Sequence, residues 1–195
     1  MSTSRQRVGG TMRVYVFIDG GYVRARLREL KLPLLHPADL ASRLVDTPAL
    51  RALTPNVPFM ASRVNYYDAF AEGELRRVDV ENYWSAIELL PNVHLGFGEL
   101  RGLQRKVRQK GVDTLIAVDM VVGAFSGTYQ MGILVAGDAD FVPVLEEVKR
   151  RGVSVVVAGW SVSLAQELQR AADRYIEIQR DWLTPMQVSG GPVPA

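Results

Sequence analysis

The stretch that decides the fold is VYVFIDGG, residues 14–21. Its first five residues are apolar or aromatic without alternation, which is typical of a strand that is buried on both faces of a sheet. The stretch LVAGDADF, residues 134–141, repeats this arrangement, because glycine and aspartate again follow an apolar run directly. Runs of this kind alternate with helical patterns along the chain, and that order predicts a parallel sheet covered by helices on both faces.

The spacing of apolar residues predicts the individual elements. Strands are expected over residues 14–18, 59–67, 93–97, 132–136, 153–158 and 175–178. Helices are expected over residues 21–30, 37–45, 74–90, 112–125, 141–150 and 162–172, with a loop over 47–58. Because crossovers between parallel strands are right-handed, this order predicts an α/β fold, a three-layer α/β/α sandwich with a mostly parallel, Rossmann-like sheet. We assign residues 12–183 to this domain, 1–11 to a flexible leader and 184–195 to a flexible tail.

The composition excludes several classes of protein. The chain has 195 residues, 48% of them hydrophobic, and a formal net charge of +2. It has no cysteine, which excludes disulfides, thiolate zinc sites and cysteine nucleophiles. The longest apolar runs have the length of strands, and none has the length of a signal peptide core or a membrane span. We therefore expect a cytoplasmic protein that does not enter a membrane.

Aspartates follow two of the predicted strands at the point where each strand ends. Asp19 follows the first strand, Asp138 and Asp140 follow the strand at 132–136, and Asp113 lies at the start of a predicted helix. In an open parallel sheet, ligands bind at the carboxyl ends of the strands. Taken singly, each aspartate is also explained as a helix cap or a turn residue.

Two aspartates at neighbouring strand ends favour a metal site over caps alone. A cap needs one aspartate, whereas Asp138 and Asp140 supply two. Two unit charges about 4 Å apart repel by about 4 kcal/mol at an effective dielectric constant of 20. A hard divalent cation held by carboxylate oxygens removes this repulsion, and Mg²⁺ or Mn²⁺ suits such ligands. We expect Asp19, Asp138 and Asp140 to hold the ion.

Two further features accompany these acids. Asp119 lies six residues beyond Asp113 and about 120° around the same helix, so the two do not share a face. It is either a group that supports the site or a buried structural acid. Five basic residues precede Asp113 and are expected to contact the phosphate backbone of a nucleic acid, unless they form only a solvated face: Arg101, Arg105, Lys106, Arg108 and Lys110.

Five motifs together resemble a known family. They occur in this order: VFIDGG at 16–21, NYYDA at 65–69, KGVD at 110–113, AGDADFVP at 136–143 and RGVSV at 151–155. The chain resembles the NYN domain family, the LabA-like branch of the PIN-like nuclease superfold, over residues 13–178. The resemblance implies a metal-dependent ribonuclease whose acidic pocket is formed by Asp19, Asp113, Asp138 and Asp140. One position departs from the pattern, since Tyr22 stands where the family often has asparagine.

The expected function is therefore hydrolysis of RNA phosphodiester bonds, on a single-stranded substrate, with Mg²⁺ or Mn²⁺ as cofactor. The alternative is a non-catalytic RNA-binding or regulatory module of the same fold. A nicotinamide-binding domain is disfavoured, because no G-x-G-x-x-G loop follows the first strand. RNA against DNA, and endonuclease against exonuclease action, stay open. A homodimer through the segment 74–90 or the loop 47–58 also stays open.

Overall fold

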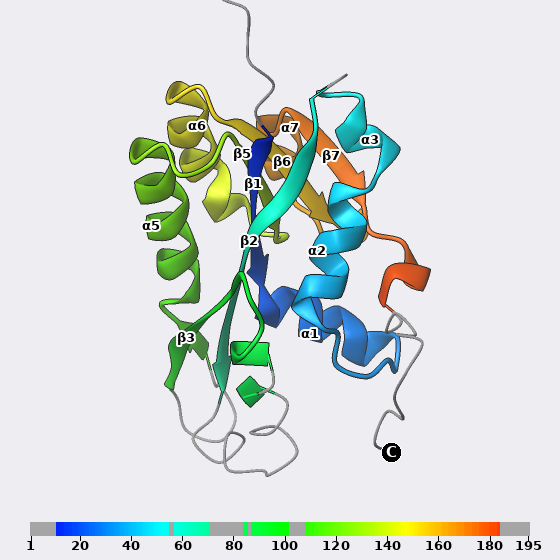
Figure 1. Ribbon diagram of the computed structural model, residues 1–195. Coiled ribbons are helices and arrows are strands. Elements are labelled where there is room, and N and C mark those ends of the chain that lie inside the picture. The colour runs from blue at the N-terminus through cyan, green and yellow to red at the C-terminus, as the bar shows by residue number, and fades with distance from the viewer. Residues whose placement is uncertain (1–10, 55–56, 71–83, 86, 102–107, 184–195) are drawn as a thin grey trace, which may run out of the picture.

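The computed structural model describes residues 11–54, 57–70, 84–85, 87–101 and 108–183 (Figure 1). Its sheet contains these strands: β1 Met12–Asp19, β2 Phe59–Phe70, β3 Val93–Arg101, β4 Arg108–Lys110, β5 Met131–Val135, β6 Ser154–Gly159 and β7 Arg174–Glu177. They lie in the order β4-β3-β2-β1-β5-β6-β7. Six of the strands are parallel, and β4 alone runs antiparallel, to β3. The predicted mostly parallel sheet is confirmed.

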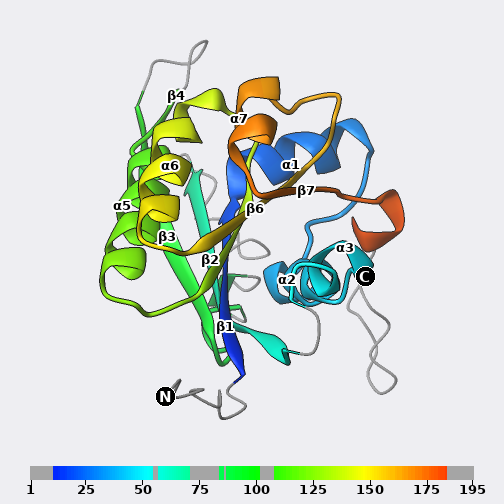
Figure 2. The ribbon, with the colours of Figure 1, turned by 90° about the horizontal axis from the view of Figure 1, so that it is seen from above.

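Helices cover both faces of this sheet. They are α1 Gly20–Glu29, α2 Pro37–Val45, α3 Pro48–Arg51, α5 Val112–Phe125, α6 Val142–Arg150 and α7 Gln166–Ala171. Two short 3₁₀ turns are η1 Ala139–Phe141 and η2 Arg180–Leu183. Figures 1 and 2 show α5 and α6 on one face of the sheet, and α1 and α2 on the other. The predicted three-layer sandwich is therefore confirmed.

The side chains of β1 show why the apolar run does not alternate. Val14, Val16 and Ile18 point into the core beneath α1 and α2. Phe17 points the opposite way, into the core beneath α5 and α6. Because β1 is the central strand, both of its faces are buried, and an apolar residue is needed at every position.

Some predicted elements differ in extent. The strand predicted over 59–67 continues to Phe70, and the helix predicted over 162–172 begins only at Gln166. The loop predicted over 47–58 contains the short helix α3. Most of the helix predicted over 74–90 lies outside the described residues. In the described part of the chain, no helix combines the length and the apolar character needed to cross a membrane.

Candidate active site at the carboxyl edge of the sheet

The parallel strands end at one edge of the sheet, and the predicted acids lie along it. Asp19 is the last residue of β1 and pairs in register with Tyr67 of β2. On the other side of β1, Ile18 is in register with Val135, the last residue of β5. Asp138 follows that strand end by three residues. The topology therefore brings segments distant in sequence to the same edge.

Asp19 is a helix cap and also an acid with a perturbed pKa. One of its carboxylate oxygens accepts a hydrogen bond of 3.1 Å from the backbone N–H of Tyr22, which caps α1. Burial, together with the negative charges of Asp113 and Asp68, raises the pKa of Asp19 to about 6. The hydrogen bond to Tyr22 opposes this shift. The cap interpretation is thus correct for Asp19, but it does not account for the neighbouring charges.

Asp113 interacts electrostatically with the acids of two other segments at this edge. It lies in the first turn of α5, whose N-cap is Gly111, a residue with a left-handed φ of 91° that glycine adopts without strain. Partial loss of hydration raises the pKa of Asp113, and the charges of Asp138 and Asp140 raise it as well. The charges of Asp138 and Asp140 therefore act on Asp113, and its own charge acts on Asp19.

Asp138 and Asp140 lie in the connection from β5 to α6. A side-chain oxygen of Asp138 accepts a 2.9 Å hydrogen bond from the backbone N–H of Asp140 and so caps η1. Both side chains are exposed. Asp140 caps no helix in the described structure, so the second acid of this pair is left without a structural role there.

The donor set agrees in chemistry with a hard divalent cation, which prefers carboxylate oxygens. Mutual repulsion among these acids is the condition that a bound cation would relieve. In their described positions, however, no three acidic or histidine side chains are arranged to hold a metal ion. Binding an ion through three carboxylates therefore requires that the aspartate side chains turn toward one another.

Sequence reasoning missed a fifth acid, Asp68. Its side chain is fully buried near the end of β2 and forms a 2.6 Å ion pair with Arg24 of α1. Burial raises the pKa of Asp68, and the Arg24 guanidinium opposes that shift. The missed signal was an aspartate following the apolar pair Tyr66 and Tyr67, the same pattern as at Asp19. Because Asp68 is paired and enclosed, it acts on the site through its charge.

Gly20 makes room for this buried pair. A Cβ atom at Gly20 would lie 2.6 Å from a carboxylate oxygen of Asp68 and 2.6 Å from the ring of Tyr66. The hydroxyl of Tyr66 donates a 3.1 Å hydrogen bond to Asp68. The glycine after the first aspartate thus permits close packing behind the site.

Tyr22 joins the loops that surround the acids. Its hydroxyl oxygen accepts a 2.9 Å hydrogen bond from the backbone N–H of Trp160 and lies 3.1 Å from the hydroxyl of Ser163. Its ring fills space that only glycine leaves free, since a Cβ at Gly137 would lie 2.5 Å from it and one at Gly159 would lie 2.7 Å from its hydroxyl. Tyr22 thereby fixes the β5–α6 and β6–α7 connections to α1.

A hollow of about 630 Å³ opens beside these residues. It is lined by Asp19 and Tyr22, by residues 137–139 and by residues 162–165. A 2.9 Å hydrogen bond from the N–H of Ala165 to the carbonyl of Gly137 joins the last two of these segments. The size agrees with a small-molecule or nucleotide-sized ligand.

The remaining predicted residues have different outcomes. Asp119 is exposed on α5 and accepts a 2.6 Å hydrogen bond from the hydroxyl of Tyr67, so it is not a buried acid. Arg101, Arg108 and Lys110 belong to the strands β3 and β4, while their side chains are outside the described part of the molecule. Arg105 and Lys106 lie outside the described residues altogether. Contact of this basic stretch with nucleic acid stays a prediction.

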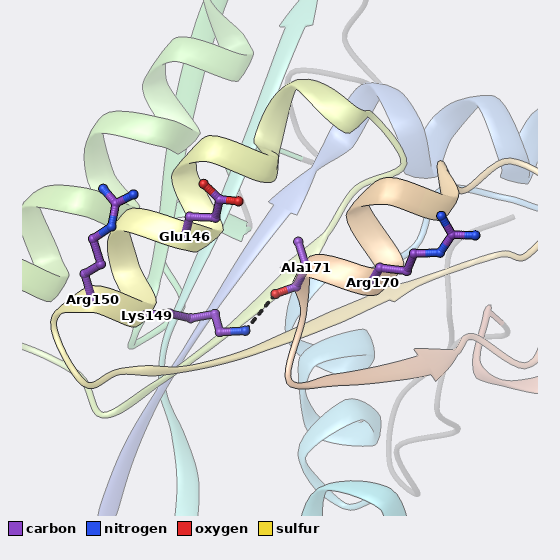
Figure 3. Close-up of a pocket in the computed structure, with 5 residues that line it drawn as sticks. All are labelled: Glu146, Lys149, Arg150, Arg170 and Ala171. Atoms are coloured by element: carbon purple, nitrogen blue, oxygen red, sulfur yellow. Dashed lines mark hydrogen bonds between the residues drawn. The ribbon is translucent and has the colours of Figure 1, made fainter.

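A second hollow, of about 570 Å³, lies between the C-terminal ends of α6 and α7 (Figure 3). It is lined by basic side chains that already have partners. Lys149 pairs with Asp173 at 2.9 Å and donates to the carbonyl of Ala171, and Arg150 pairs with Glu147 at 2.7 Å. The acids precede the N-terminal end of α6, about 13 Å from its C-terminal end. This hollow is therefore not part of the acidic site.

A mostly parallel sheet with helices on both faces and aspartates grouped at its carboxyl edge defines an α/β protein of the Rossmann-like class. The chain belongs to the NYN family: the family model described as NYN domain matches residues 13–179. The family predicted from the sequence motifs is thus confirmed, and with it a nuclease-like fold. The branch within the family stays a prediction.

One solved structure supports the fold. A crystal structure of a protein of unknown function from Vibrio parahaemolyticus is similar with a TM-score of 0.60 and 19% identity, over 92% of this chain and 99% of that chain. The nicotinamidase of Staphylococcus aureus is similar with a TM-score of 0.37 and 11% identity, over 86% of this chain and 100% of that chain. No curated protein matches the chain.

Proposed function

We propose that this protein is a metal-dependent ribonuclease that hydrolyses RNA phosphodiester bonds at the acidic edge of its sheet. The supporting observation is that aspartates from three separate segments share this edge: the charge of Asp113 raises the pKa of Asp19, and the charges of Asp138 and Asp140 raise the pKa of Asp113. A fold that keeps such repulsion gains from a bound cation, and membership of the NYN family is consistent with that use.

Each acid has a proposed role. Asp19, Asp138 and Asp140 would hold Mg²⁺ or Mn²⁺, and Asp113 would bind it directly or through a water molecule. When bound, the ion supplies a Lewis acid that activates water and neutralises charge on the scissile phosphate. Arg24 holds Asp68 in place, so that the negative charge of Asp68 behind Asp19 is partly compensated.

The basic stretch 101–110 is the proposed contact for the RNA backbone. Its strands β3 and β4 form a hairpin at the carboxyl end of β3, and β4 leads directly into α5 and Asp113. The backbone therefore carries Arg101, Arg108 and Lys110 on the same edge as the acids. Cations at this place would attract a polyanion that the acids alone repel.

A second candidate is an RNA-binding module without catalysis. Two observations favour it: Tyr22 occupies the position where the family often has asparagine, and the described acids hold no ready-made group of three ligands. Such a module would bind RNA through the basic stretch and leave it intact.

One experiment separates the two candidates. Purified protein is incubated with labelled single-stranded RNA, and with DNA of the same sequence, in Mg²⁺, Mn²⁺ or EDTA. The ribonuclease proposal predicts cleavage of RNA that EDTA abolishes and that Asp138→Asn slows by about a hundredfold or more. The matched control Asp46→Asn replaces an exposed aspartate that pairs with Arg51 and should cleave like wild type. RNA binding without cleavage, or equal cleavage by Asp138→Asn, would contradict the proposal.

A further inference from the structure

Helix α5 carries an apolar stripe on its outer surface. Leu115, Val118, Val122 and Phe125 are 39%, 51%, 56% and 52% exposed. The opposite side of the helix, with Ile116 and Met120, is fully buried against the sheet. A surface helix normally places polar residues on its solvent side, whereas this stripe is apolar. At its C-terminal end the guanidinium of Arg151 lies over the Phe125 ring, 3.3 Å from the ring centroid.

The spacing of the stripe is the same when read from either end. The intervals between successive members are three, four and three residues, which keeps them on one face of the helix and follows the alternation of three and four that is typical of a helix–helix seam. If two copies of α5 pack antiparallel across a two-fold axis, Leu115 of one copy faces Phe125 of the other, and Val118 faces Val122. A two-fold contact requires such self-complementarity.

The two terminal segments of this chain are less suited than a second copy to pack on the stripe. The described chain ends at Leu183, in η2, which packs in the core beneath α2 on the opposite face of the sheet. The twelve residues beyond it, TPMQVSGGPVPA, are rich in proline and glycine and lack the spacing of an apolar helix. The first ten residues, MSTSRQRVGG, contain only Met1 and Val8 as large apolar side chains. Figures 1 and 2 show α5 at a margin of the molecule.

We propose that the stripe on α5 binds a second copy of this chain, antiparallel, to form a two-fold symmetric dimer. Half-exposed side chains of this size supply roughly 300 Å² per copy. Stable complexes typically bury about 800 Å² per partner. The dimer is therefore weak and depends on concentration. Because Asp113 lies in the first turn of α5, the antiparallel arrangement places the two acidic edges at opposite ends of the pair, where both stay open to substrate.

The test is the molar mass in solution as a function of protein concentration, by light scattering or sedimentation. Wild type should shift from the monomer mass toward the dimer mass as concentration rises through the micromolar range. The double variant Val118→Asp, Val122→Asp should weaken association at least about tenfold. Leu34→Asp is the matched control, since Leu34 is 40% exposed and lies outside the stripe and outside the segments 47–58 and 74–90. Unchanged circular dichroism of all variants shows that folding is not the cause.

The orientation is tested by cysteine crosslinking, because the chain has no cysteine of its own. Oxidation of a mixture of Val118→Cys and Val122→Cys proteins should produce mainly the mixed disulfide. A wild type that is monomeric at every concentration, or a dimer that the double aspartate variant leaves intact, overturns the proposal. So does a monomer that dimerises only after deletion of residues 184–195, because the tail would then be the cover.

Discussion

Asp19 combines three demands on one side chain: it ends β1, caps α1 and faces other acids. The pKa of Asp19 is about 6 in the folded chain, against an ordinary value of 3.8. Between about pH 4 and pH 6, the folded chain therefore keeps a proton on Asp19 that the unfolded chain has released. The contribution of Asp19 to the free energy of unfolding therefore falls as the pH rises from about 4 to about 6, and it is lost at higher pH.

The variant Asp19→Asn should consequently stabilise the metal-free protein at pH 8, by about 1–3 kcal/mol, and leave it nearly unchanged at pH 3.5. Asparagine retains the oxygen that accepts from Tyr22 and removes the buried charge. Urea unfolding in EDTA at both pH values measures this. Asp46→Asn, an exposed acid, should change stability by less than about 1 kcal/mol at either pH. A destabilised Asp19→Asn at pH 8 would show that the carboxylate is structurally required.

Tyr22 shows how a departure from a family pattern can have a structural role. Tyr22→Phe removes the oxygen that accepts from the buried N–H of Trp160. An unsatisfied buried donor costs about 1–3 kcal/mol, so the free energy of unfolding should fall by that amount. Tyr15→Phe is the control, because the Tyr15 hydroxyl makes no hydrogen bond with the described residues, and its effect should stay below about 0.5 kcal/mol. Equal stability of both variants would contradict the role assigned to Tyr22.

At the scale of elements, the start of α5 depends on Gly111. Its φ of 91° is left-handed, and a Cβ atom at this position would meet no described atom within 4 Å, so backbone strain alone decides the cost of Gly111→Ala. We expect a loss of about 1–2 kcal/mol in urea unfolding. Gly132→Ala is a comparison with φ outside the left-handed region, where the nearest atom is 3.2 Å away. A Gly111→Ala protein as stable as wild type would contradict the claim that alanine is strained at this left-handed φ.

Sequence patterns predicted the strands that are buried on both faces, such as β1 and β5, because continuous apolar runs leave few alternatives. They did not predict β4, since it is only three residues long and its residues, Arg108–Lys110, are polar. The site was predicted where an acid directly follows an apolar run. Asp68 was missed although it directly follows the strand predicted over 59–67, because its role depends on its burial and on the ion pair with Arg24, which the sequence pattern does not show.

At the scale of the whole molecule, a cation that binds only the folded chain must stabilise it. Mn²⁺ or Mg²⁺ at a hundred times its dissociation constant should add about 2.7 kcal/mol and raise the melting temperature by about 5–10 °C at pH 8. Asp138→Asn should lose most of this shift, whereas Asp46→Asn should keep it. The readout needs no RNA, so it tests the ion site apart from catalysis. An equal rise in the melting temperature of both variants would show that the ion binds away from Asp138.

The most direct test of the central claim is a crystal of the protein soaked in Mn²⁺ and measured at the manganese absorption edge. We predict one or two anomalous peaks among Asp19, Asp138 and Asp140, with the carboxylates turned toward the ion. A map at full soaking concentration with no peak at this edge, and with Asp19 and Asp138 still only capping their helices, would contradict a metal-dependent nuclease.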